Sequence, residues 1–347
     1  MTERALIEFA RGYGAAAGGA RAFAKTLLAR AAMREADGGS AASRVLLEAA
    51  AREIDEALPR AEAIADPDGT VRFAIHLADG AIVETVLIEQ RASTNLRKRD
   101  RFTVCVSSQV GCARGCVFCE TGRLGFVRNL AAWEIVAQFA IAARHLRARD
   151  ASLSPSNLVF MGMGEPLDNL EAVLGAIGVL REPRGFAVGE RRITVSTVGI
   201  VPRMDELYAR TRANLAVSLH ALEEKSRIAL LPIARKFSLA QLRAAIARAP
   251  RTVLLQWTLI AGQNDSDAQA EQLAEFCRGL DVRVNLIPLN PGPIAAQRPP
   301  TLEQCRAFQK RLADAGVRAL LRLPHGQEIG GACGQLAGAR RATEQRR

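Results

Sequence analysis

The stretch Phe102-Thr-Val-Cys105-Val-Ser-Ser-Gln-Val-Gly-Cys112-Ala-Arg-Gly-Cys116-Val-Phe-Cys119 decides the fold. It begins with a short apolar run that predicts a buried strand, and it continues into a loop with three cysteines in a CxxxCxxC spacing. Three thiolates on one short loop can bind one metal centre, and a four-iron cluster held by three cysteines leaves one iron open for a cofactor. The alternatives are a zinc site completed by Cys105 or a distant histidine, and three unrelated thiols.

Outward from this stretch, short apolar runs alternate with helical patterns as far as residue 323. Such strand–helix units indicate a parallel sheet, and six or seven of them predict an α/β fold with a TIM-like barrel, full or partial, which we expect as (βα)6. In such a barrel the chemistry lies at the carboxyl ends of the strands. The predicted strands are 102–106, 157–161, 192–197, 214–219, 252–259, 282–288 and 319–323, and the predicted helices include 133–147 and 268–280.

The first 100 residues differ from the barrel in pattern. Apolar residues recur at helical spacing from residue 1 to about 67, with a break at 37–40. A strand pair follows at 71–77 and 81–88, joined by an Asp-Gly turn that is typical of hairpins, and the basic segment 91–101 is predicted to be a loop. We therefore expect a small N-terminal α+β appendage over 1–100 that is a candidate RNA contact, a barrel core over 101–338, and a basic tail over 339–347.

The composition restricts the class of protein. Lys and Arg number 47 against 36 Asp and Glu, a net charge of +11, and 49% of the 347 residues are hydrophobic. A disordered or fibrous chain is excluded. The positive charge favours a polyanionic partner, nucleic acid above all, and the alternative is a merely soluble basic surface. No apolar run approaches the roughly 20 residues of a membrane span, and the first residues lack a signal-peptide pattern. We expect a cytoplasmic monomer with no membrane association.

The cysteine loop, with an aromatic residue before its last cysteine, resembles that of the radical S-adenosylmethionine (SAM) enzymes. The run from Cys105 to Cys112, followed by Gly-Phe-Val-Arg-Asn-Leu at 125–130, resembles the RlmN/Cfr family of RNA adenine methyltransferases. The resemblance implies that Cys112, Cys116 and Cys119 hold a 4Fe-4S cluster whose open iron binds SAM. It also implies an RNA substrate and an electron donor such as flavodoxin.

Polar residues at the predicted strand ends extend this resemblance. Glu165 lies in a Gly-Glu-Pro turn after the second strand and, by the resemblance, accepts a hydrogen bond from the SAM amino group. Each of these polar residues taken alone could instead be a cap. The SAM-binding residues that the resemblance implies are Gly164, Glu165, Ser196, Ser218, Leu219, His220 and Asn290.

Cys333, in the sequence Ala-Cys-Gly-Gln-Leu, resembles the family's methyl-carrying cysteine. Carbon 2 of adenine has no nucleophilicity, so a polar methyl transfer from SAM cannot work there. The resemblance implies that one SAM methylates Cys333, that a radical from a second SAM activates this methyl group, and that it adds to the adenine. Cys105 then helps to remove the ring proton and closes a transient disulfide with Cys333. Glu84 aligns with the family's proposed proton acceptor; otherwise it is a solvent-facing strand residue.

Three functions remain open at this stage. The first is RlmN-like methylation of adenosine carbon 2 in 23S ribosomal RNA, with tRNA as a second candidate substrate. The second is Cfr-like methylation of carbon 8, or methylation of another RNA. The third is a non-catalytic iron–sulfur or zinc RNA-binding protein, which would not need Cys105 and Cys333 together. Cys277 and Cys305 lie on predicted helices and are expected to be core residues.

Overall fold

The structure is a computed structural model that describes residues 51–52, 54–91, 100–183, 185–292, 294 and 296–337. The expected helical break at 37–40, the residues before it and the tail 339–347 lie outside the described residues, as do residues 92–99 of the predicted basic loop. Residue 101 of that loop already belongs to a strand.

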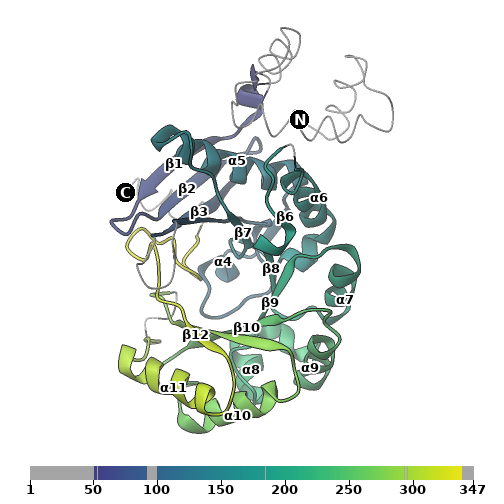
Figure 1. Cartoon of the computed structure of the whole chain (residues 1–347), viewed down its shortest axis with the longest axis vertical. Coiled ribbons are helices and arrows are strands. Elements are labelled where there is room, and N and C mark those ends of the chain that lie inside the picture. Colours follow the sequence, from purple (N-terminus) through teal and green to yellow (C-terminus); the bar gives the residue numbers. More distant parts are fainter. Residues whose placement is uncertain are drawn as a thin grey trace.

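One sheet of 10 strands, in the order β1-β2-β3-β4-β7-β8-β9-β10-β11-β12, runs through the described part of the chain (Figure 1). From β4 onward all neighbours pair in parallel, which confirms the predicted α/β barrel and each of its seven predicted strands. The barrel is open, because β1 and β12 are the two edges of this sheet. The parallel strands are β4 (Arg101–Cys105), β7 (Asn157–Phe160), β8 (Ile193–Thr197), β9 (Asn214–Ser218), β10 (Val253–Leu259), β11 (Val282–Pro288) and β12 (Ala319–Leu321).

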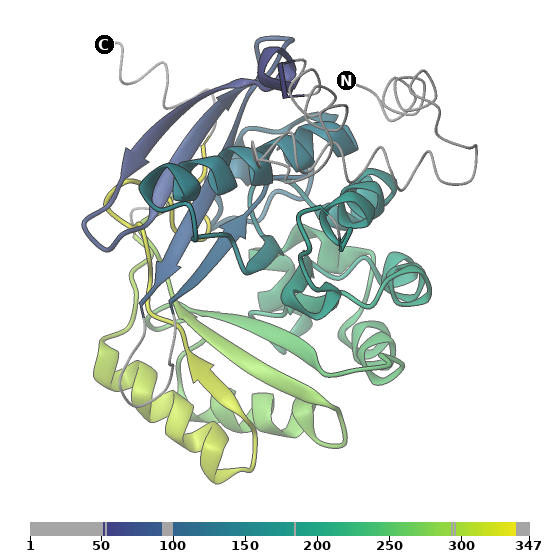
Figure 2. The same cartoon turned by 45° about the horizontal axis from the view of Figure 1, so that its top comes forward.

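The longer helices cover the outside of the curved sheet, and the short α4 lies within it (Figures 1 and 2). Three of them begin with a capping box, in which a Ser or Thr and a Gln three residues later bond each other's backbone: Ser238 in α9, Ser266 in α10 and Thr301 in α11. The helices are α4 (Glu120–Arg123), α5 (Ala132–Arg149), α6 (Leu170–Leu180), α7 (Val201–Arg210), α8 (Glu224–Leu230), α9 (Leu239–Ala247), α10 (Asp267–Cys277) and α11 (Leu302–Asp314), with short 3₁₀ turns at Pro166–Asn169, Glu190–Arg192 and Pro232–Arg235. Cys277 and Cys305 are buried on α10 and α11, as predicted.

The N-terminal strands continue the barrel sheet. The predicted hairpin is present as β2 (Val71–His76) and β3 (Ile82–Gln90), and β3 pairs antiparallel with β4. The expectation of helical structure to residue 67 is wrong at its end, because β1 (Arg60–Ala65) is an edge strand paired with β2. Its alanines gave no strand signal, and the strand forms because β2 offers a partner for its backbone.

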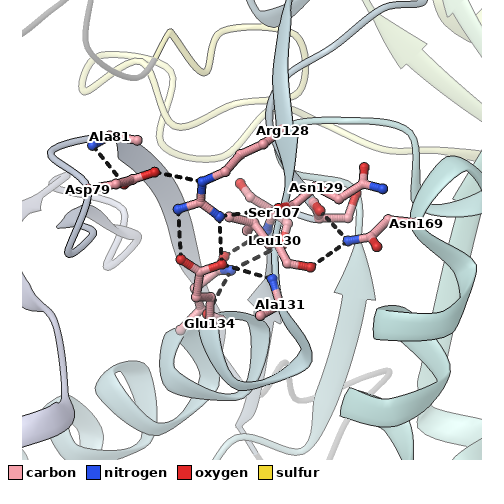
Figure 3. A network of polar contacts seen from close by, with 11 residues as sticks. Asp79, Ala81, Ser107, Arg128, Asn129, Leu130, Ala131, Glu134 and Asn169 are labelled. Carbon is pink, nitrogen blue, oxygen red and sulfur yellow. Dashed lines mark hydrogen bonds and ion pairs between the residues drawn. The ribbon is translucent and has the colours of Figure 1, made fainter. Parts of the chain in front are cut away.

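A two-stranded ribbon, β5 (Gln109–Gly111) and β6 (Phe126–Asn129), flanks the cysteine loop. At Gly111 a Cβ atom would lie 1.9 Å from the carbonyl oxygen of Gly125, so only glycine fits this close approach. Figure 3 shows how Arg128 fixes β6: its Nε donates to Asp79 at 2.6 Å, and its two terminal nitrogens donate to Glu134 of α5 at 2.8 Å. The loop is thus held between the hairpin turn and a helix.

The chain after β12, residues 322–337, is called the C-terminal segment below. It runs from the edge of the barrel back to the N-terminal strands, where the backbone of Gly326 and Ala337 bonds Asp68 and Glu84 (Figure 1). It therefore crosses the open side of the barrel and carries Cys333 there. Within the described ranges, no helix is long and apolar enough to pass through a membrane.

Candidate functional site

A cavity of about 140 Å³ lies at the carboxyl ends of the parallel strands. The structure brings almost all of the predicted site residues to its wall, although they are spread over 222 positions of sequence from Cys112 to Cys333. The wall includes Cys112, Cys116, Cys119, Gly164, Glu165, Ser196, Ser218, His220, Asn290 and Cys333. Leu219 is fully buried and is not part of this wall.

The cysteine loop forms one side of the cavity. Its backbone is fixed at both ends, because the Cys112 amide donates to Gly125 at 2.8 Å and the Val117 amide donates to Leu230 at 3.1 Å. Burial raises the pKa of the Cys112 thiol to about 12, and it also raises the pKa of Cys116 and Cys119. Thiolates are therefore costly here unless a cation compensates their charge.

The donor set fits an iron–sulfur cluster. Across the residues that the structure describes, no three His, Cys, Asp or Glu side chains are grouped closely enough to hold a single ion. Each cysteine of a cluster binds its own iron, so cluster thiols surround a volume instead of meeting at one point. Three desolvated thiols on one cavity wall suit such a cluster, with its positive irons, better than a mononuclear zinc site.

Glu165 lines the same cavity as the cysteine loop and is only 3% exposed. One of its carboxylate oxygens accepts from the Leu167 amide at 3.0 Å and the other from the Val198 amide at 2.9 Å. Burial nevertheless raises its pKa to about 7. Each oxygen retains a lone pair, so the carboxylate can still accept a hydrogen bond from a ligand. The preceding Gly164, at φ +94°, packs against Gln109 where a Cβ atom would clash.

His220 at the end of β9 is a buried, neutral imidazole. Its backbone adopts φ 59°, its Nδ1 accepts from the Thr258 amide at 2.9 Å, and burial lowers its pKa to about 3. Asn264 supports this turn, since its Nδ2 donates to the carbonyls of His220 and Thr258 at 2.9 and 2.7 Å. Sequence reasoning missed Asn264, which lies in a loop after β10 and outside any motif.

Ser196 and Asn290 both donate to backbone carbonyls. The Ser196 hydroxyl donates to Phe160 at 2.7 Å. Asn290 donates to the Cys333 carbonyl at 3.0 Å and accepts from Gln327 at 3.1 Å. Asn290 therefore contacts the C-terminal segment as well as lining the cavity.

Cys105 and Cys333 share a second, smaller cavity of about 30 Å³. Cys105 is buried at the end of β4, and burial raises its pKa to about 12, whereas Cys333 is exposed and lines both cavities. All seven cysteines are free thiols. This cavity has room for about one water molecule, and both cysteines line it.

Relatives of known class share this architecture. A model of the radical SAM superfamily matches residues 106–277. A probable RNA methyltransferase from Sorangium cellulosum is 49% identical over 280 residues, which cover 80% of this chain and 68% of that protein. The dual-specificity RNA methyltransferase RlmN of Syntrophobacter fumaroxidans is 45% identical over 273 residues, covering 78% and 77%. The crystal structure of a radical SAM methyltransferase from Sphaerobacter thermophilus superimposes with a TM-score of 0.82 at 39% identity, covering 97% of both chains.

The chain belongs to the RlmN/Cfr family of radical SAM RNA methyltransferases. Radical SAM enzymes use SAM and a 4Fe-4S cluster, and the cavity has three thiols, a carboxylate and strand-end hydroxyls of the types that such groups need. When bound, the cluster and SAM supply an organic radical and a methyl group.

Glu84 of this RlmN/Cfr-family chain was predicted to be a proton acceptor or a solvent-facing strand residue, and its carboxylate is buried. It is 1% exposed and not solvent-facing, and it lines neither of the two cavities. Its carboxylate pairs with the buried Arg72 and accepts from the Ala337 amide at 2.6 Å. Sequence reasoning missed Arg72, because an arginine in a strand is usually exposed.

Proposed function

We propose that the enzyme methylates carbon 2 of an adenosine in 23S ribosomal RNA, with tRNA as a second candidate substrate. The observation that carries the proposal is the placement of two thiols, Cys105 and Cys333, on one small cavity directly beside the three-cysteine loop. A non-catalytic iron–sulfur protein has no need for this second pair. The RlmN names of the relatives favour RlmN-like over Cfr-like chemistry, and the RlmN resemblance implies carbon 2 as the target atom.

The residues divide the work as follows. Cys112, Cys116 and Cys119 hold the cluster. The residues that bind and orient SAM are Gly164, Glu165, Ser196, Ser218, Leu219, His220 and Asn290, with Leu219 fully buried. Cys333 carries the methyl group to the adenine, since an exposed thiol on a glycine-flanked segment can face both the cofactor cavity and the RNA.

Cys105 resolves the protein–RNA intermediate. Burial raises the pKa of the Cys105 thiol to about 12, so it keeps its proton at neutral pH until a base removes it, and only the resulting thiolate attacks sulfur. The Cys105 thiolate attacks the Cys333 sulfur, the bond from that sulfur to the RNA-bound carbon breaks, and the electron pair passes to this carbon, which takes up a proton to give the methyl group. Glu84 is the candidate proton acceptor, although its present contacts hold the chain near Cys333.

The proposed compartment, oligomeric state and electron donor follow from the same assignment. We assign the enzyme to the cytoplasm as a monomer, with a one-electron donor such as flavodoxin. The charge of +11 supports an RNA substrate, since phosphates bind basic surfaces through release of their counterions.

Mass spectrometry of nucleosides from 23S ribosomal RNA and tRNA, in cells with and without the gene, tests the target. Loss of 2-methyladenosine supports the proposal and identifies the RNA. Loss of 8-methyladenosine instead reassigns the chain to Cfr-like chemistry, and loss of neither overturns the proposed target. Cys105→Ala should accumulate the protein–RNA crosslink, whereas normal turnover by this variant would rule out the resolving role of Cys105.

A further inference from the structure

The N-terminal strands hold the C-terminal segment near both of its ends. Near its start, the Gly326 amide donates to the Asp68 carboxylate at 2.9 Å, in the turn between β1 and β2. At its end, the Ala337 amide donates to Glu84 of β3 at 2.6 Å. Cys333 lies between these two anchors. Strands that sequence analysis assigned to an accessory region therefore support the loop that carries a reactive thiol.

The second anchor contains a buried charge pair. The side chains of Arg72 and Glu84 are 5% and 1% exposed, and they form an ion pair between β2 and β3. Arg72 lies diagonally across from Glu84, since Ala74 is directly opposite Glu84 in the register, and a long side chain can span this separation. Among the described residues, the buried Nε of Arg72 has no hydrogen-bond partner. The guanidinium of Arg72 therefore loses part of its hydration where it contacts Glu84.

Glu84 uses its two oxygens for different partners. Oε1 accepts from Arg72, and Oε2 accepts from the Ala337 amide. A carboxylate buried this deeply is costly without a compensating cation, so the contact with Ala337 depends on the guanidinium that balances its charge. Ala337 is buried and only four residues beyond Cys333, and the neighbouring Leu336 is held through its carbonyl by Thr121 at 2.7 Å.

We propose that Arg72 is a positioning residue for Cys333: through Glu84 it fixes the Ala337 end of the C-terminal segment and so keeps the thiol at the junction of the two cavities. The role of this thiol as methyl carrier rests on the proposed function. Arg72 itself lines neither cavity, so it acts through Glu84 and not on substrate.

Arg72→Met tests this assignment, with Arg72→Lys as the conservative variant. Hydrogen exchange, followed by mass spectrometry of the peptides that cover residues 326–337, should be about tenfold faster in R72M than in the wild type, because a local anchor is lost. With reconstituted enzyme, kcat for methylation of Cys333 should fall about tenfold in R72M while the KM for SAM stays within about twofold. R72K should restore both quantities to near wild-type values.

A second pair on the same strand gives a matched control. Glu89 of β3 is also buried, and it pairs with Arg149 at 3.0 Å without a hydrogen bond to the C-terminal segment. Glu89→Gln and Arg149→Met should therefore leave exchange of residues 326–337 unchanged. If R72M does not fold, Glu84→Gln removes the charge and one of the two acceptor oxygens with little change of shape, so it cannot accept from both Arg72 and Ala337 and should accelerate exchange of the same peptides.

Unchanged exchange in R72M or E84Q would overturn the proposal, as would an equal acceleration in E89Q. The exchange measurement needs no activity, which separates this proposal from the proposed function. If exchange responds as expected but the wild-type enzyme never carries a methyl group on Cys333, then the positioning role stands and the methyl-carrier role fails.

Discussion

The two sides of the cavity are built differently. On the barrel side, Glu165 and His220 follow parallel strands, and their side chains accept from the backbone amides of Val198 and Thr258 near the ends of other strands. On the other side, Cys333 lies in a segment with no regular structure after β12. Separate hydrogen bonds hold this segment: the Gly326 and Ala337 amides donate to Asp68 and Glu84, while Asn290, the Glu120 amide and Thr121 donate to carbonyls of residues 333, 334 and 336. The difference indicates a cofactor side built on paired strands and a Cys333 side held by individual contacts that can open locally.

Loss of the cluster should have the largest effect, and it tests whether the two sides are separable. Cys116→Ala removes one of the three proposed iron ligands, so we expect loss of bound iron and complete loss of methylation activity. Hydrogen exchange of residues 326–337 should stay as in the iron-free wild-type protein, because the hydrogen bonds that hold the segment to Asp68, Glu84, Asn290 and Thr121 do not involve the Cys116 side chain. Iron content and exchange mass spectrometry measure the two effects.

Cys277→Ala is the matched control, since Cys277 is a buried thiol on α10 outside both cavities. It should retain iron and activity. Faster exchange of the C-terminal segment in C116A than in the iron-free wild type would show that the two sides are coupled. The claim that they are separable would then be wrong.

The barrel side was predictable from the sequence because it is periodic. The alternation of strands and helices located every strand end, and polar residues at those ends met at one cavity. The support of Cys333 was not predictable in the same way. Arg72 and Ala337 are 265 positions apart and belong to no motif, and β1 depends on pairing with β2 more than on its own alanine-rich sequence. These contacts arise from tertiary packing, which a local pattern does not encode.

Burial of the Glu165 carboxyl on the barrel side makes the unfolding free energy depend on pH. Its pKa is raised from 4.5 to about 7 because it is buried. A carboxyl whose pKa is higher in the folded than in the unfolded state adds stability that is complete below about 4.5 and is lost as the pH rises through about 7. The apoprotein should therefore lose on the order of 3 kcal/mol of unfolding free energy over that range from this group.

Glu165→Gln removes the titrating group and should flatten this part of the pH profile. Chemical denaturation of both proteins at several pH values between 4.5 and 8 measures the slopes, and the difference between them isolates Glu165 from other carboxyls. Gln cannot accept from both the Leu167 and Val198 amides, so a constant loss of stability is expected in addition. Identical slopes would show that ionisation of buried Glu165 does not lower the unfolding free energy over this pH range.

Thr121 joins the two sides, and its replacement should have the smallest effect of the three. It is buried on α4, two residues after the proposed cluster ligand Cys119, and its hydroxyl donates to the Leu336 carbonyl at 2.7 Å. Thr121→Val keeps the shape but removes the donor, which should lower the unfolding free energy by about 1 kcal/mol. Exchange at residues 326–337 should rise less than in R72M, because a neutral hydrogen bond is lost and no buried charge is left unbalanced. Thr121→Ser retains the hydroxyl and should restore the wild-type exchange rate; if T121S exchanges as fast as T121V, then the methyl packing of Thr121, and not its hydrogen bond, joins the two sides.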